Sequence, residues 1–109
     1  MTDQKKSRRQ KLEEYVAQNP NDAFSRYGVA LECLREGDKA AAEAQFRTLI
    51  ENNADYVPGF QMYAQMLAQE ERREEARTIL TAGIAAATRT GNAHARSEME
   101  GLLSELEAG

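Results

Sequence analysis

The chain has 109 residues, of which 41% are hydrophobic and 29% charged, and its formal net charge is −4. This composition indicates one globular domain with a modest core and argues against a disordered chain. Cys33 is the single cysteine, which excludes an intramolecular disulfide and a multi-cysteine metal site. With no signal-peptide pattern and no apolar run of about 18 residues, we expect a cytoplasmic protein with no membrane association.

The first segment, residues 1–11, is basic, whereas the end of the chain is acidic. A basic arm can bind nucleic acid or an anionic surface. No aromatic residues are interleaved with the cations, so we favour a frayed, solvated terminus and do not expect nucleic-acid binding. The charges concerned are Lys5, Lys6, Arg8, Arg9 and Lys11 at the start, and Glu98, Glu100, Glu105 and Glu107 at the end.

Proline, glycine and capping residues divide the rest of the chain into helices. The breaks are "NPND" at 19–22, "GD" at 37–38, "NNADYVP" at 52–58 and "GN" at 91–92. Asp22 or Asn21 is the expected cap of the second helix, and Asp55 that of the fourth, which has Pro58 in its first turn. Helices are therefore predicted at 8–18, 22–36, 38–52, 56–70, 72–89 and 92–107, each with apolar residues at helical spacing.

The helices repeat a pattern of small and large side chains at a constant interval along the chain. Leu12, Phe46 and Leu80 are in register, as are Val16, Ile50 and Ile84, and the alanine pairs Ala30/Ala64 and Ala42/Ala76 share the interval. Small residues allow two antiparallel helices to approach, and a large neighbour fills the groove between them. The repeat therefore predicts stacked helical hairpins.

The registered positions are 34 residues apart. This interval and the pattern of small and large residues resemble the tetratricopeptide repeat family, whose repeats are about 34 residues long. Val29, Ala30, Cys33, the Gly37–Asp38 turn, Ala42 and Phe46 match its signature in the first full repeat. Phe60, Tyr63, Ala64, Leu67, Ala76 and Leu80 match it in the second. The resemblance implies a right-handed α-α superhelix in one domain, 1–109: a half repeat at 8–22, repeats at 23–56 and 57–90, and a C-terminal capping helix at 91–109.

Three residues depart from the family pattern. Arg26 replaces the large apolar opener, Ala54 the closing proline of the first repeat, and Glu71 the turn glycine of the second. We expect Glu71 to weaken the turn at 70–72. The final helix is expected to bury Met99, Leu102, Leu103 and Leu106.

The residues give no support for an enzyme, a metal or a cofactor. His94 is the single histidine and is expected on the surface, which excludes a two-histidine metal helix. Cys33 falls on the packing face and is expected to be a small core residue. The glycines are too dispersed for a phosphate-binding loop. Glutamates 70, 71, 74 and 75 alternate with arginines 72, 73 and 77, which is typical of a solvated, ion-paired face.

The remaining candidate surface is the groove that the resemblance places along the first helix of each repeat. Its expected lining is Phe24, Tyr27, Leu31, Leu34 and Arg35 from the first repeat, and Pro58, Gln61, Gln65, Ala68 and Gln69 from the second. Spacing alone makes the first four of these an apolar ridge, and Gln61, Gln65 and Gln69 an amide row. Some family members bind a C-terminal carboxylate with lysines and asparagines at these positions. This chain has Tyr27, Leu31, Gln61 and Gln65 there instead, so we do not expect that specificity.

Three elements could pack on the apolar ridge and bury it: helix 8–18, a second copy of the chain, or a segment of a partner protein. The leading hypothesis is a non-catalytic interaction module that binds a protein or peptide in the groove. The alternative is a self-associating structural subunit, a homodimer through the ridge of helix 22–36.

Overall fold

The computed structural model describes residues 5–109 and contains six α-helices and no strand within them. They are α1 (Arg8–Gln18), α2 (Ala23–Arg35), α3 (Lys39–Asn52), α4 (Val57–Gln69), α5 (Arg73–Thr90) and α6 (Ala93–Ala108). Every helix end lies within one residue of its predicted position. The prediction of an all-α chain of about six helices is confirmed.

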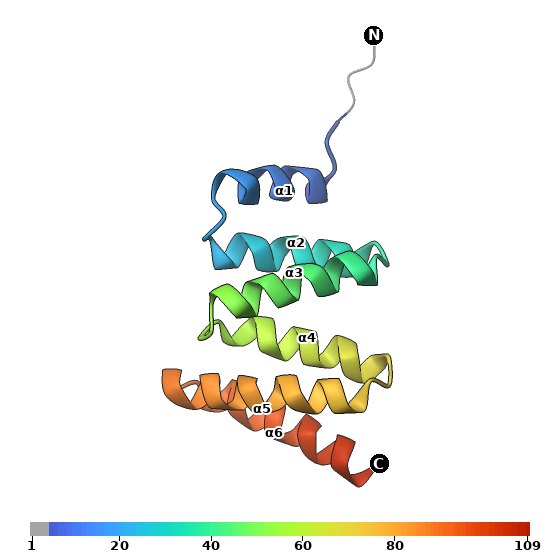
Figure 1. The fold of residues 1–109 in the computed structure, drawn as a ribbon, viewed down its shortest axis with the longest axis vertical. Coiled ribbons are helices and arrows are strands. Elements are labelled where there is room, and N and C mark those ends of the chain that lie inside the picture. Colours follow the sequence, from blue (N-terminus) through green and yellow to red (C-terminus); the bar gives the residue numbers. More distant parts are fainter. Residues whose placement is uncertain (1–4) are drawn as a thin grey trace. The chain divides into compact units, whose positions relative to one another are not determined.

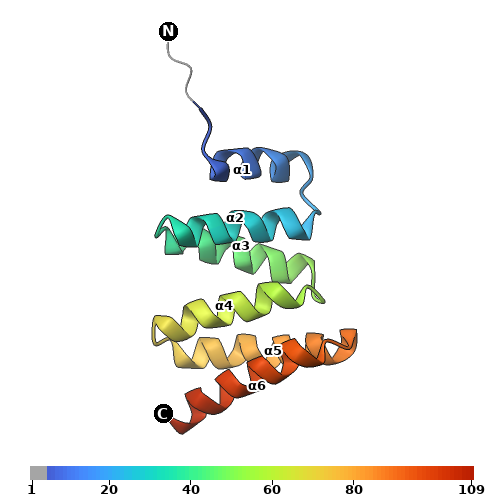
Figure 2. The same cartoon turned by 180° about the vertical axis from the view of Figure 1, so that it is seen from behind.

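The helices belong to two compact units, Met1–Asn52 and Asn53–Gly109, and each unit is described by itself. In the first unit α2 and α3 form an antiparallel hairpin, and α1 packs against α2 (Figure 1). In the second unit α4 and α5 form the corresponding hairpin, and α6 packs against α5, as the opposite view also shows (Figure 2). The two units thus repeat one hairpin design.

Alanines stand where the helices of each hairpin cross. Ala30 and Ala42 in the first unit, and Ala64 and Ala76 in the second, are all 0% exposed. Large side chains fill the space beside them, because protein interiors pack at the density of organic crystals. The fully buried large residues include Phe46 and Leu49 in α3, Leu67 in α4 and Leu80 in α5.

The turns inside the two hairpins have the same backbone conformation although their residues differ. Gly37 has φ = 81° and its N–H donates to the Leu34 carbonyl at 3.0 Å. Glu71, at the equivalent position of the second hairpin, has φ = 61° and its N–H donates to the Ala68 carbonyl at 3.0 Å. The left-handed region is unfavourable for a residue with a Cβ, so the second turn is strained where the first is not.

We therefore expect Glu71→Gly to raise the free energy of unfolding. Release of the left-handed strain is worth about 1–2 kcal/mol, and the greater freedom of glycine in the unfolded chain removes about 0.4–1 kcal/mol of that. A net gain of up to about 1.6 kcal/mol should appear in urea unfolding followed by circular dichroism. Gly37→Glu is the reciprocal variant and should lower stability. A stabilising Gly37→Glu would contradict the strain at this position.

Local hydrogen bonds compensate for the other departures from the repeat pattern. Arg26 donates to the Gln45 side chain at 3.0 Å and to the Pro20 carbonyl at 3.2 Å, which ties the start of α2 to α3 and to the preceding loop. Arg89 of α5 donates to the Ala54 carbonyl at 3.1 Å. These contacts hold the loops where the family pattern has an apolar residue or a proline.

The predicted caps are confirmed for α2 but not for α4. The Asp22 side chain accepts a hydrogen bond from the backbone N–H of Ser25, as expected of an N-cap. The cap of α4 is Tyr56, which makes no side-chain cap bond. Asp55 instead binds Arg89, with 2.8 Å between Oδ1 and Nη2, because the arginine competes for its carboxylate.

The last helix, α6, buries less than predicted. Met99 is 1% exposed, but Leu102, Leu103 and Leu106 are only partly buried. Aligning α6 with α4 by their N-caps, Asn92 and Tyr56, places Glu100 where α4 has the buried Ala64. Glu100 forms an ion pair with Arg96 at 3.1 Å on this face. The face that packs in α4 is therefore polar in α6.

Candidate protein-interaction surface

The predicted apolar ridge of α2 consists of Phe24, Tyr27, Leu31 and Leu34, and it is graded in exposure. Phe24, in the first turn of α2, is 74% exposed. The other three side chains are partly buried. The hairpin-facing residues Val29, Ala30 and Cys33 are at most 1% exposed. Phe24 is thus the most accessible apolar side chain of the ridge.

Helix α1 lies beside the ridge rather than over Phe24. A Cβ built on Gly28 would lie 3.5 Å from a Leu12 methyl group, so Leu12 of α1 packs on the glycine. Gly28 lies on the side of α2 next to Phe24, with no side chain of its own to hold α1 away. Helix α1, the first of the three elements considered to cover the ridge, therefore leaves the Phe24 side chain largely exposed to solvent.

Arg35 sits at the far end of the ridge and is already engaged with a buried carboxylate. Its Nη2 lies 2.8 Å from Glu32 Oε1, and Arg8 of α1 approaches the other oxygen of Glu32 at 3.6 Å. Glu32 is 7% exposed. The hydrogen bond from Arg35 lowers the pKa of Glu32, although burial opposes this.

The predicted amide row on α4 is divided. Gln65 and Gln69 are exposed. Gln61 donates to Glu98 of α6, with 2.8 Å between Nε2 and Oε1, and is partly buried. Two members of the row are therefore accessible, while the third links two helices of the second unit.

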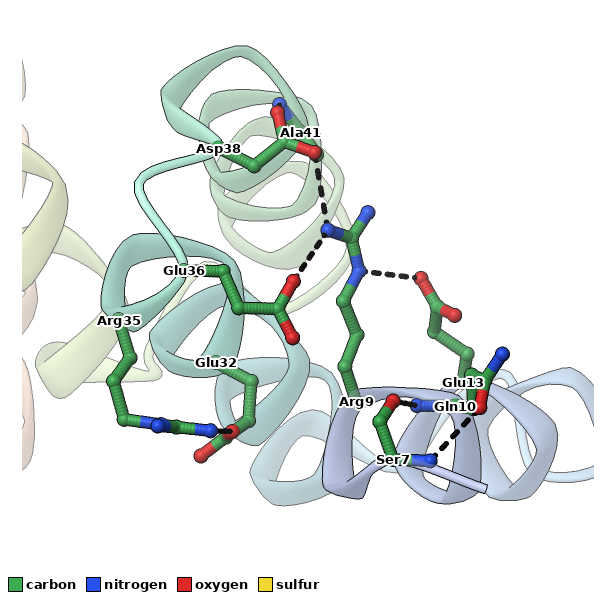
Figure 3. Close-up of polar contacts among 9 residues, drawn as sticks. All are labelled: Ser7, Arg9, Gln10, Glu13, Glu32, Arg35, Glu36, Asp38 and Ala41. Carbon is green, nitrogen blue, oxygen red and sulfur yellow. Dashed lines mark hydrogen bonds and ion pairs between the residues drawn. The ribbon is translucent and has the colours of Figure 1, made fainter. Parts of the chain in front are cut away.

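Arg9, predicted to lie in a solvated terminus, instead joins three segments of the first unit (Figure 3). Its guanidinium binds Glu13 of α1 at 3.0 Å, Glu36 at the end of α2 at 3.1 Å and Asp38 at the start of α3 at 3.0 Å. Such charge-assisted hydrogen bonds are stronger than neutral ones. The side chain of Arg9 is only 22% exposed.

The interpretation of residues 1–11 as a frayed basic terminus is therefore wrong from Ser7 onward. Ser7 begins α1 with a capping box, in which its hydroxyl and backbone N–H both bond Gln10. Lys6, Arg8 and Arg9 all form ion pairs with glutamates. Residues 1–4 lie outside the described residues. Pairing of these cations with the protein's own carboxylates also disfavours a nucleic-acid arm.

The cluster around Arg9 perturbs its neighbours. The Arg9 hydrogen bond lowers the pKa of Asp38, and the backbone N–H of Ala41, which Asp38 caps at 3.2 Å, lowers it further. Burial raises the pKa of the Cys33 thiol, while the Arg9 charge partly opposes this. Cys33 is 0% exposed and free, so its prediction as a core residue is confirmed.

The other polar residues behave largely as expected. The side chain of His94 is 86% exposed and lies 3.3 Å from Glu98. In the charged segment at 70–77, Arg77 pairs with Glu74, and Arg72 pairs with both Glu70 and Glu75.

Between residues 5 and 109 no group of three His, Cys, Asp or Glu side chains is arranged to hold a metal ion. Over the same range, no helix combines the length and apolarity that a bilayer span requires.

Comparison with solved structures relates the chain to bacterial repeat domains. A solution structure of a tetratricopeptide repeat domain protein from Salinibacter ruber is 28% identical, with a TM-score of 0.77 over 82% of this chain and 90% of that one. A crystal structure of a protein so described from the same organism is also 28% identical, with a TM-score of 0.74 over 80% of this chain and 97% of that one.

A third structure supports the fold alone. It is a solution structure of a Bordetella parapertussis protein, 20% identical, with a TM-score of 0.78 over 95% of this chain and 90% of that one. No protein-family model matches the chain, and no curated protein matches it in sequence.

The resemblance inferred from the repeat is confirmed by these structures together with the six helices. Repeat domains of this kind are in general non-catalytic modules for protein interaction. The chain therefore has a small all-helical fold of the tetratricopeptide-repeat type.

Proposed function

We propose that the chain binds a protein or peptide segment on the apolar ridge of α2. The observation that carries the proposal is the 74% exposure of Phe24 at the start of the ridge. Exposed aromatic side chains are enriched at the centre of protein interfaces, because they bury much area at low entropic cost. The tetratricopeptide-type fold supports the same conclusion, because such domains generally bind proteins.

The expected mechanism is apolar anchoring without chemistry. Phe24 would enter the partner's apolar surface, and the partly buried Tyr27 and Leu31 would extend the contact along α2. Arg35, at the end of the ridge, is already paired with Glu32 and would contribute less. Burying one phenylalanine side chain is worth about 1.5–3 kcal/mol, so the ridge needs several such contacts to reach micromolar affinity.

The test is affinity capture from the native cell extract followed by titration of the captured partner. Phe24→Ala should weaken binding about ten- to a hundredfold, as loss of one buried phenylalanine predicts. Tyr15→Ala is the matched control, since Tyr15 on α1 is also a large exposed apolar residue, at 48%, but lies outside the ridge. Equal loss of binding in both variants would contradict the ridge.

Self-association is the alternative function of the same ridge. A second copy could cover Phe24 and Leu31 in place of a foreign segment. Light scattering of the purified chain distinguishes the two, because a dimer that Phe24→Asp dissociates would assign the ridge to the homodimer. A monomer that still captures a partner supports the leading proposal.

The amide row is a separate part of the proposal. Gln65 and Gln69 are exposed on α4 and could hydrogen-bond a ligand backbone, whereas Gln61 is held by Glu98. Gln65→Ala should therefore weaken binding more than Gln61→Ala does, with little change in thermal stability.

A further inference from the structure

Helix α1 is attached to the first unit in an unusual way. Val16 is the only α1 residue that is buried, and Leu12 is partly exposed where it packs on Gly28. By contrast, the polar attachment is extensive: Arg9 reaches Glu36 and Asp38, and Arg8 reaches Glu32. The apolar contact of α1 is small compared with that of α3, which buries Ala42, Phe46 and Leu49.

These contacts differ in their response to salt. Ion pairs between partly exposed groups weaken as ionic strength rises, since the Debye length falls from about 10 Å at 0.1 M to about 3 Å at 1 M. Apolar contacts, which hold α2 on α3, are not weakened by sodium chloride. Rising salt therefore lowers the free energy of detaching α1 more than that of unfolding the α2–α3 hairpin.

We propose that α1 is a flap, latched by Arg9 onto the turn between α2 and α3, that opens as a unit before the rest of the first unit unfolds. Opening requires that Arg9 leave Glu36 and Asp38 and that Leu12 leave Gly28. The hinge would be the loop between α1 and α2, at residues 19–22. Local openings of this kind draw on elements with few buried apolar contacts.

Cys33 lies on the last turn of α2 beside the latch, where its carbonyl accepts a hydrogen bond from the backbone N–H of Asp38 at 2.8 Å, so its labelling can report the opening of α1. The thiol is fully buried, and Cys33 stands three residues before Glu36, which Arg9 binds at 3.1 Å. Opening the flap uncovers the side of α2 that carries Gly28, next to the ridge, and so adds to the surface available to a partner there. That last consequence rests on the proposed function, whereas the opening itself does not.

The experiment measures the rate at which N-ethylmaleimide labels Cys33 in the full chain, at low and high sodium chloride. Arg9→Gln should speed labelling roughly tenfold at low salt, because it removes the charge-assisted hydrogen bonds of the latch. Salt should speed labelling of the wild type and should have a smaller effect on Arg9→Gln, in which the Arg8–Glu32 ion pair still links α1 to α2. Circular dichroism should show both proteins folded under these conditions.

Arg96→Gln is the matched control, since it removes an equal charge and an ion pair with Glu100 at 3.1 Å on α6. Its labelling rate should stay within about twofold of the wild type. If Arg9→Gln does not fold, Glu36→Gln tests the same latch from the exposed end of α2. Wild-type labelling that is insensitive to salt, or labelling that follows global unfolding in every variant, would overturn the flap.

Hydrogen exchange gives an independent reading without any substitution. Backbone amides of α1 should exchange faster than those of α2 and α3, and salt should widen the difference. The flap concerns the attachment of α1 alone, so capture of a partner by the ridge can succeed or fail whatever this measurement shows.

Discussion

Phe46→Ala is expected to cost about 3–5 kcal/mol of unfolding free energy, the usual range for truncating a fully buried phenylalanine. Phe46 is 0% exposed and lies on α3 one turn after the buried Ala42. The substitution removes the large side chain of the crossing and leaves a cavity that α2 and α3 can fill only by shifting. Small domains are stable by about 5–15 kcal/mol, so much of the margin would be lost.

Phe24→Ala is the control for this prediction, because it makes the same chemical change at a side chain that is 74% exposed. Its unfolding free energy should stay within about 0.5 kcal/mol of the wild type. Urea unfolding followed by circular dichroism measures both. If the two variants were equally destabilised, Phe46 would not be the core residue that its burial indicates.

The repeat could be predicted from the sequence because it depends on side-chain size at a fixed interval. Ala30 and Ala64 occupy equivalent places in successive repeats, and both are fully buried. The glycine and aspartate signals located the helix ends to within one residue, because these residues form turns and caps locally. Asp55 is the exception as a cap, since Arg89 of α5 binds its carboxylate. Glu71 shows the limit of such signals: the turn keeps its conformation and accepts the strain.

The Arg9 cluster could not be predicted in this way. Its partners Glu36 and Asp38 lie 27 and 29 residues further along the chain. Helical periodicity relates residues three or four apart on one helix, so it does not point to such distant partners. Ion pairs between distant segments leave no periodic trace in a sequence, so the basic segment was indistinguishable from a solvated terminus. Glu32 was missed for the same reason, since a lone glutamate on a helix is ordinarily exposed.

The candidate surface was predictable in part. Helical spacing places Phe24, Tyr27 and Leu31 on one face of α2, but spacing does not say how far neighbouring helices cover each side chain. The same holds for Gln61 and Gln65, which spacing treats alike. The structure distinguishes them, because Glu98 of α6 reaches the first, whereas the second is exposed.

Gly83→Ala should destabilise the second unit, because overpacking costs about 1–3 kcal/mol. A Cβ at Gly83 would lie 2.7 Å from Phe60 Cβ on α4 and 2.7 Å from Met99 Sδ on α6. The thioether of Met99 can move aside, but Phe60 Cβ is fixed to its backbone, so α4 itself would have to shift. Alanine also has the better helix propensity, by about 1 kcal/mol, so the net loss of unfolding free energy should be up to about 2 kcal/mol.

Gly101→Ala isolates the propensity effect, since nothing lies within 4 Å of the Cβ position and Gly101 is exposed within α6. This variant should gain about 0.5–1 kcal/mol. The two glycine-to-alanine changes are therefore expected to have opposite signs, a difference of several degrees in thermal midpoint for a chain of this size. A stabilising Gly83→Ala would mean that α4 and α6 do not meet across α5 at this residue, because alanine would then bring its propensity and no collision.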